Sequence, residues 1–238
     1  CQRLSLPEPG SERLIREICW FHNSRLGDTT ASYAQGCEVL RITKRDDITD
    51  QWNMKRVVAA IDEWTRSGKH KASSILLWFS PPNYGGSARA RKLCIRREKE
   101  GKDVTKFDQL YLEFKDLFEC FVKLQKIIVQ HGGYWAFELP SGCQFLNTRQ
   151  VKVFSKRSGA KHVILKGCIV GLKNTRNNLP YEMNWRIMSN SVYLIERLSD
   201  RVCPGPSVHP NHVPLRRVGA EMVENFDKYT AVFVMPLS

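Results

Sequence analysis

Hydrophobic positions recur at helical spacing in two stretches of the chain. The pattern over 53–64 predicts a helix, whose apolar positions are Met54, Val57, Val58, Ile61 and Trp64. A longer stripe, with steps of three or four residues, predicts a second helix over 107–128. Its members are Phe107, Leu110, Phe114, Leu117, Phe118, Phe121, Leu124 and Ile128. Gly132-Gly133 is expected to end this helix, because glycine readily adopts the left-handed conformation common after a helix.

Short apolar runs predict strands between and after these helices. SSILLWF (73–79) is typical of a parallel strand buried on both faces, and YWAFEL (134–139) reads as the next buried strand. Further strands are predicted over 13–20, 37–43, 151–154, 162–165 and 229–235. The alternation of strands and helices indicates an α/β fold with a three-layer, doubly wound, Rossmann-like sheet. We expect a single domain over 1–238, with a proline-rich excursion around 201–217.

Charge points to a class of partner. The formal net charge of +13, from 37 Lys and Arg against 24 Asp and Glu, favours contact with DNA or RNA. A solvated basic surface with no specific partner is the alternative. No apolar run is long enough to cross a bilayer, and the basic residues do not gather on one amphipathic helix, so no membrane partner is expected. Eight cysteines without a CxxC pair, and an opening segment without a signal-peptide pattern, favour a reducing intracellular compartment, nucleus or cytoplasm.

Polar positions follow the predicted strands at places where ligands bind. SPPNYGGS (80–87) comes directly after 73–79, and open α/β sheets bind ligands beyond the carboxyl ends of their strands. Gly85-Gly86 would allow a planar substrate to approach closely, although an ordinary turn explains these residues equally well. Glu138 is costly on an apolar strand unless its carboxylate is bonded, or it simply reaches solvent. Glu17, beside the polar turn at 22–28, is a weaker candidate for accepting hydrogen bonds from a ligand.

A basic segment follows the Pro-Pro turn. Its cationic residues are Arg89, Arg91, Lys92, Arg96, Arg97, Lys99, Lys102 and Lys106, interrupted by Glu98, Glu100 and Asp103. The segment lacks helical or strand periodicity, so we expect a mobile basic loop. Because the segment borders the candidate pocket, phosphate contact by Arg89, Arg91, Lys92, Arg96 and Arg97 is favoured over a merely solvated face.

A thiol and two imidazoles near the C-terminal end form a candidate metal site. Cys203, His209 and His212 lie within ten positions and have side chains that bind Zn²⁺, with Cys168 as the candidate fourth ligand. The spacing matches no standard zinc finger. The prolines of this stretch also fit a structured loop without metal.

In this order, the segments resemble motifs of the C5-cytosine DNA methyltransferases, and more closely their divergent relatives in phage and mobile elements. Glu17-Ile18-Cys19 is similar to the family's first, cofactor-binding motif, and Asp47-Ile48-Thr49 to the Asp-Ile motif that faces the adenine. SPPNYGGS resembles the catalytic loop, and Phe137-Glu138-Leu139 the Glu-Asn-Val motif whose Glu contacts the target cytosine. Trp185–Asn190, followed by Cys203 and His209, is similar to a Trp-x-Ile-x-Thr-Asn string of the divergent relatives.

The resemblance implies the class I S-adenosylmethionine-dependent methyltransferase fold and assigns roles to residues. Glu17, Asp47 and Ser80 would hold S-adenosylmethionine. Pro82, Asn83 and Glu138 would hold the target base.

Two positions depart from the family pattern. The glycine-rich first loop is replaced by WFHNSRLG, which keeps only Gly27. The catalytic Pro-Cys becomes Pro82-Asn83, and Asn cannot supply the thiolate that adds to C6 of cytosine. Cys94, eleven positions further on, has no motif around it. Ser-Pro-Pro-Asn also resembles the signature of amino-methyltransferases, whose polar groups bind an exocyclic NH₂ without a covalent step, although Asn83 takes its aromatic position and Tyr84 comes one place later.

Two hypotheses follow. The first is a nucleic-acid-binding protein of methyltransferase fold, either methylating without a Cys nucleophile or inactive. The second is a non-catalytic nucleic-acid-binding or assembly module of a mobile element or virus.

Overall fold

A computed structural model describes residues 40, 42, 46–66, 75–170, 179–205 and 212–214. The predicted strands over 13–20 and 229–235 lie outside these residues. Of the strand predicted over 37–43, only Leu40 and Ile42 are described. Within the described ranges, no helix is both long enough and apolar enough to cross a membrane.

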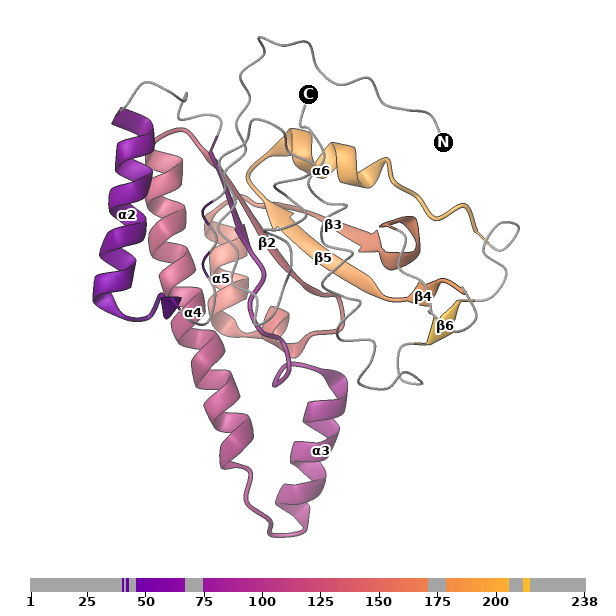
Figure 1. Ribbon diagram of the computed structural model, residues 1–238. Coiled ribbons are helices and arrows are strands. Elements are labelled where there is room, and N and C mark those ends of the chain that lie inside the picture. Colours follow the sequence, from indigo (N-terminus) through magenta and orange to yellow (C-terminus); the bar gives the residue numbers. More distant parts are fainter. Residues whose placement is uncertain are drawn as a thin grey trace.

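The structure is a mixed α/β arrangement around a four-stranded sheet. The strands are β1 (Leu76–Phe79), β2 (Tyr134–Pro140), β3 (Lys161–Lys166) and β5 (Asn184–Ser189), in the order β1-β2-β5-β3 (Figure 1). The strands predicted over 73–79, 134–139 and 162–165 are therefore confirmed. Within this described sheet, only β1 and β2 pair in parallel, since β5 runs antiparallel to both β2 and β3. The described sheet is thus mixed, which confirms the α/β class, and the three-layer, Rossmann-like arrangement stays a prediction.

Each face of the sheet has its own apolar core. On one face, Leu77, Phe79 and Phe137 pack with Phe118 and Phe121 of α4 (Thr105–Gln130). Phe79 and Phe121 stack with their ring centroids 4.6 Å apart. All four residues of β1 are buried, as the continuous apolar run predicted for a strand covered on both faces.

The opposite face is covered by α6 (Val192–Ser199). Its Leu194, Ile195 and Leu198 join a cluster with strand residues that alternate with those of the first face. These strand residues are Leu76, Trp78, Ala136, Val163, Leu165, Trp185 and Ile187. The string Trp185–Asn190 thus has a folding role: Trp185 and Ile187 are buried here, and the Asn190 side chain accepts a hydrogen bond from Trp135 N at 2.8 Å.

The two predicted helices are confirmed. The first is α2 (Gln51–Arg66), which buries Val57 and Ile61 and begins where Asp50 Oδ1 accepts hydrogen bonds from the amides of Trp52 and Asn53. The second is α4, whose C-terminal end is followed by Gly132 with a φ of 79°.

The strand predicted over 151–154 is wrong, because this segment belongs to α5 (Arg149–Arg157). Thr148 caps this helix by accepting a hydrogen bond from Val151 N at 3.4 Å. Val151 and Phe154, three residues apart, are buried, whereas Val153 is 40% exposed. A helix brings Val151 and Phe154 to one face, and a strand would have paired Val151 with Val153 instead.

The mobile loop predicted after the Pro-Pro turn is also wrong. Residues Ala88–Lys99 form α3, whose first amides are capped by Ser87 Oγ, which accepts from Ala90 N at 3.1 Å. Ala, Arg, Lys, Leu and Glu favour helix, and neither Gly nor Pro interrupts them. None of the α3 side chains is buried, so the helix carries no apolar stripe from which periodicity could predict it.

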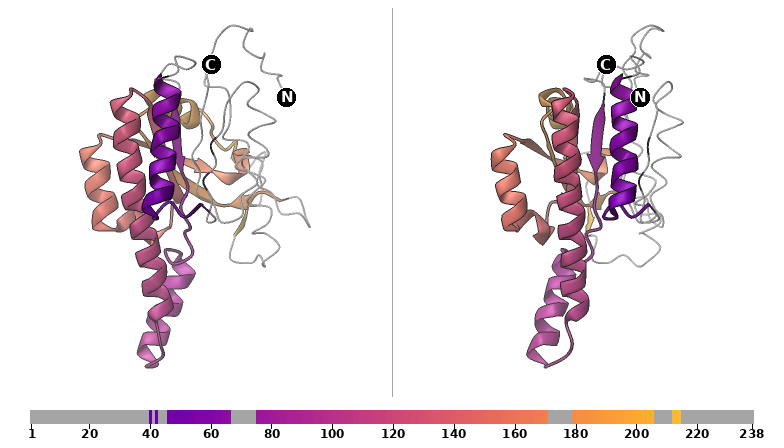
Figure 2. Two further views of the ribbon diagram at one scale, coloured as in Figure 1. Left: turned by 60° about the vertical axis from the view of Figure 1, so that its left-hand side comes forward. Right: turned by 90° about the vertical axis from the view of Figure 1, so that its left-hand side faces the viewer.

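The helix α3 and the N-terminal part of α4 extend together beyond the sheet, as Figures 1 and 2 show. The buried side chains of α4 begin only at Phe114, two turns after the helix starts at Thr105. The α3–α4 hairpin is therefore a projection that starts from the carboxyl end of β1.

Candidate functional site

A buried carboxylate lies where the two parallel strands end. Ser80 and Glu138 directly follow the paired residues Phe79 and Phe137, and both are buried, with exposed fractions of 2% and 4%. Glu138 Oε2 accepts hydrogen bonds from Ser80 Oγ and from Trp78 Nε1, each at 2.9 Å. Trp78 Nε1 also donates to Ser80 Oγ at 3.0 Å. We call Trp78, Ser80 and Glu138 the carboxylate cluster.

The carboxylate cluster bears on the predictions made for Glu138 and Ser80. Glu138 does not reach solvent, so the bonded alternative holds, and its donors come from the neighbouring strand. Ser80, predicted to hold a cofactor, directs its hydroxyl to Glu138. Trp78 was not identified from the sequence, because its indole reads as one more apolar residue of a buried strand. A donor placed two residues before Ser80 on the same face of β1 is the signal that could have found it.

The loop after β1 forms a tight turn. Gly86 N donates to the carbonyl oxygen of Asn83 at 3.1 Å, which closes a turn over 83–86. Pro82 and Asn83 are partly exposed, and the side chain of Tyr84 is 54% exposed. The predicted catalytic pair Pro82-Asn83 and Glu138 thus both lie at the carboxyl ends of the parallel strands, where such sheets bind ligands.

Gly85 and Gly86 allow other side chains of the protein to pack closely against the turn. A Cβ added to Gly86 would lie 2.5 Å from Cys143 Sγ, and one added to Gly85 would lie 2.8 Å from Leu110 Cβ. Gln144 N donates to the Gly86 carbonyl at 2.7 Å, which fixes the turn against the segment after β2. The close approach that was expected for a substrate is therefore made by neighbouring side chains.

The five predicted phosphate-binding residues all lie on α3. Arg89, Arg91, Lys92 and Arg96 are exposed, and Arg97 is partly exposed. Three of the five make contacts inside the protein. Arg91 Nη1 donates to Gln144 Oε1 at 2.8 Å, Arg97 Nε donates to the Asp103 carbonyl at 2.9 Å, and Arg96 Nε lies 3.9 Å from Glu100 Oε1. Glu100 also lies 2.8 Å from Lys102 Nζ. The helix therefore presents a strongly positive surface on the projecting hairpin.

Asp47, predicted to face the cofactor, lies on the surface just before α2. Its φ is 26°, and its Oδ1 accepts from Thr49 Oγ1 at 2.6 Å and from Thr49 N at 3.2 Å. Ile48 beside it is buried in the core. Figures 1 and 2 place the start of α2 toward the end of the sheet from which α3 projects. Glu17 and the loop WFHNSRLG lie outside the described residues.

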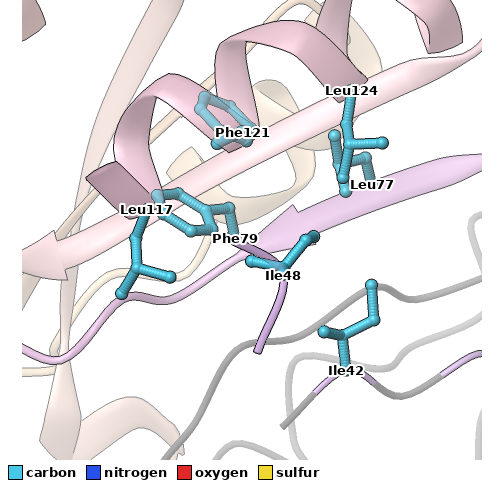
Figure 3. A pocket seen from close by; sticks show the side chains of 7 residues that line it. All are labelled: Ile42, Ile48, Leu77, Phe79, Leu117, Phe121 and Leu124. Atoms are coloured by element: carbon cyan, nitrogen blue, oxygen red, sulfur yellow. The ribbon is translucent and has the colours of Figure 1, made fainter. Parts of the chain in front are cut away.

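A cavity of about 140 Å³ adjoins Asp47. Its lining mixes polar side chains, from Asp46, Asn53 and Arg56, with apolar ones from Ile48 and Val57. A neighbouring gap of about 10 Å³, drawn in Figure 3, is lined only by apolar side chains from β1, α4, Ile42 and Ile48. The gap is a packing defect of the core, since it offers a ligand no polar partner.

Among the described cysteines, none lies on the turn at Asn83, where the resemblance would place a nucleophile. Cys94 lies in the middle of α3, about 10 Å along the helix axis from Ser87, and is partly exposed. Cys143 packs against the turn at Gly86, but it is buried, and this burial raises the pKa of its thiol to about 11. A thiol with that pKa is protonated at neutral pH and is a poor nucleophile.

Three candidate metal ligands come together close to the C-terminal ends of β3 and α6. The ligand atoms of Cys168, Cys203 and His212 all lie within 4.8 Å of one another, and Cys203 Sγ lies 3.7 Å from His212 Nε2. Cys168, named as the additional ligand, thus joins two of the three predicted ones. His209, the third, lies outside the described residues. Burial and the neighbouring Cys203 raise the pKa of the Cys168 thiol.

The chain has no significant match among protein-family models, curated proteins or solved structures. The features that indicate a function are therefore the carboxylate cluster, the turn after β1 and the basic helix α3.

Proposed function

We propose that this domain binds nucleic acid through α3 and holds an unstacked base between the Pro82-Asn83 turn and Glu138. The observation that carries the proposal is the placement of α3. This helix has six basic residues among twelve and buries no side chain, and only eight residues separate it from the end of the buried strand β1. An exposed, cationic helix is suited to phosphate contacts, which position a nucleic acid without reading its sequence.

The carboxylate cluster supports the choice of a base as the ligand next to α3. A carboxylate accepts hydrogen bonds from exocyclic amines such as cytosine N4 or adenine N6. Enzymes that act on a base take it out of the helical stack and read its edge in a pocket. Trp78 and Ser80 hold Glu138 by its Oε2 atom, which fixes the direction of the carboxylate. The resemblance to the Glu-Asn-Val motif assigns the same role to Glu138.

The described structure supports the methyltransferase assignment only at the level of the α/β class. The resemblance implies an α/β sheet, and the described strands form a mixed sheet in which β5 lies antiparallel between β2 and β3. When bound, S-adenosylmethionine would supply an electrophilic methyl group. The resemblance assigns Asp47 and Ser80 to this ligand, and of the two the hydroxyl of Ser80 is turned to Glu138.

The chemistry that fits these residues is non-covalent. Asn83 offers an amide donor and acceptor but no thiolate, so a base would be held by hydrogen bonds rather than by addition to its ring. Direct transfer to an exocyclic amine, with Asn83 and Glu138 orienting that amine, follows from this arrangement. A binding module without catalysis would use α3 in the same way and would not bind S-adenosylmethionine.

The phosphate-binding role of α3 can be tested by the salt dependence of binding. Arg89 and Lys92 are the best pair to replace, since both are exposed and neither makes a side-chain hydrogen bond or ion pair within the described residues. In Arg89→Ala/Lys92→Ala, affinity for single-stranded DNA and RNA should fall. The slope of log K against log salt should flatten by about 0.7 per lost phosphate contact. The matched control is Lys152→Ala/Lys156→Ala, which removes the same charge from exposed positions of α5.

The outcomes separate the proposal from a general effect of charge. An unchanged slope in the α3 variant, or an equal change in the α5 variant, would remove α3 from the interface. Calorimetric titration with S-adenosylmethionine then decides between the enzyme and the binding module. Saturable heat at micromolar ligand supports the enzyme, and no heat leaves nucleic-acid binding as the function.

A further inference from the structure

Cys168 lies 35 residues before Cys203 in the sequence, and Cys203 lies nine residues before His212, yet the three side chains meet at one point. Cys168 lies in the 3₁₀ turn Gly167–Val170 directly after β3. Cys203 lies in the coil after α6, and His212 immediately precedes β6 (Val213–Pro214). Their ligand atoms lie within 4.8 Å of one another.

One of the three distances between the ligand atoms matches the spacing that a single ion requires, and all three lie within 4.8 Å. Tetrahedral zinc binds sulfur at about 2.3 Å and imidazole nitrogen at about 2.0–2.1 Å, which puts two such ligand atoms roughly 3.6 Å apart. Cys203 Sγ and His212 Nε2 lie 3.7 Å apart. Two thiols and one imidazole are soft and borderline donors that suit Zn²⁺ and do not suit Mg²⁺ or Ca²⁺.

The short strands next to these residues would be stabilised by such an ion. β6 pairs in parallel with β4 (Tyr181–Glu182) over only two residues of each strand, with Tyr181 opposite Val213 and Glu182 opposite Pro214. So short a pair is too small to be stable by itself in water. Gly167 N donates to the carbonyl of Met183 at 2.6 Å, so the Cys168 turn is already held to the segment after β4.

We propose that Cys168, Cys203 and His212 form a structural zinc site that fastens the segment after α6 to the edge of the sheet. Zinc would complete its four positions with one more ligand, as closed structural sites do. The site lies in the 3₁₀ turn after β3, the coil after α6 and the residue before β6, and it uses none of the residues of the carboxylate cluster or α3. It therefore stands independently of the proposed function.

The test uses the full chain, kept reduced, with Zn²⁺ and Co²⁺ as probes. After loading and removal of excess metal, the protein should hold about one equivalent of zinc by elemental analysis, and chelation should lower its melting temperature. Cobalt-loaded protein should show thiolate-to-metal charge transfer in the near ultraviolet and the strong visible bands of tetrahedral coordination. Cys203→Ser and His212→Gln should each weaken zinc binding by at least ~100-fold.

Both of these variants change partly buried side chains, which limits damage to the core. The matched control is Cys94→Ser, which removes a partly exposed thiol on α3 and should leave zinc binding unchanged. Protein that holds no zinc after loading, with a melt unaffected by chelator, would overturn the proposal. A Cys168–Cys203 disulfide found in place of the metal, or equal loss of zinc in the Cys94 variant, would overturn it as well.

Discussion

Ser80 Oγ donates a hydrogen bond to Glu138 Oε2 at 2.9 Å, and this contact joins the carboxyl ends of β1 and β2 across 58 residues of sequence. Trp78 Nε1 donates to the same carboxylate oxygen at 2.9 Å. A carboxylate that is 4% exposed is costly unless donors compensate it, so both donors are part of what keeps Glu138 in place. The relationship makes the site testable by changing the donors and the acceptor separately.

Removing a donor from Glu138 should destabilise the fold. Ser80→Ala and Trp78→Phe each leave the carboxylate with one donor fewer, and each should lower the free energy of unfolding by about 1–3 kcal/mol. Glu138→Gln keeps an acceptor oxygen without a buried charge, so its stability should equal or exceed that of the parent. Urea denaturation measures all three. If Glu138 serves a ligand, Glu138→Gln should lose affinity for single-stranded nucleic acid while it gains stability. A loss of stability without a loss of affinity would assign Glu138 to folding alone.

Gly86 should not tolerate a side chain. A Cβ there would lie 2.5 Å from Cys143 Sγ and 2.9 Å from the ring of Phe145, both in the core. Gly86→Ala should therefore cost about 1–3 kcal/mol of stability by overpacking. Gly142→Ala is the matched control, because no atom lies within 4 Å of its added Cβ, and it should change stability by less than about 0.5 kcal/mol. Equal unfolding midpoints for the two variants would contradict the packing of the turn.

The thiol of Cys143 should be inert at neutral pH and should weaken the fold in alkali. Burial raises its pKa from 9.0 to about 11, so the folded state keeps its proton where the unfolded state loses it. Its contribution to stability is complete below pH 9 and is lost as pH rises toward 11. For a shift of this size, the loss is about 2–3 kcal/mol. Cys143→Ala should show a flatter stability curve between these pH values than the parent, measured by denaturation at each pH.

Alkylation measures how accessible and how reactive each cysteine thiol is. At pH 8, iodoacetamide should modify the partly exposed Cys94 at least ~10-fold faster than Cys143 or Cys120, which are buried. Peptide mapping by mass spectrometry follows each site. Rapid modification of Cys143 in the folded protein would show that the turn at Gly86 opens.

No covalent complex should form with DNA that contains 5-fluorocytosine, with or without S-adenosylmethionine. Trapping requires a thiolate that adds to C6, and the turn offers Asn83 instead. Denaturing gel electrophoresis detects the adduct. A trapped complex would show that another cysteine had taken over, and Cys143→Ser and Cys94→Ser would identify it. Asn83→Cys is the complementary change, since it restores a thiol on the turn and should allow trapping if the base reaches that position.

Some of the fold was open to prediction because its signal is local. Apolar periodicity located α2 and α4, and continuous apolar runs located β1 and β2, since burial on one or both faces leaves a direct pattern in the sequence. The helix α3 was not predicted, because none of its side chains is buried and its sequence therefore has no apolar stripe. Val151 and Val153 alternate as in a strand, yet packing of Phe154 against Phe118 and Trp135 selected the helix α5.

The sequence by itself determined the basic charge of the segment after β1, the glutamate on β2 and the asparagine at position 83, where the resembled family has a cysteine. Only the tertiary structure decided which partners these residues have. The donors to Glu138 lie 58 and 60 residues away, and the Cys168 and His212 donors are separated by β5 and α6. Such contacts depend on strand order and on the antiparallel placement of β5, which follow from packing of whole elements against each other. Local propensity carries no information about that packing, because it acts only between residues that are close along the chain.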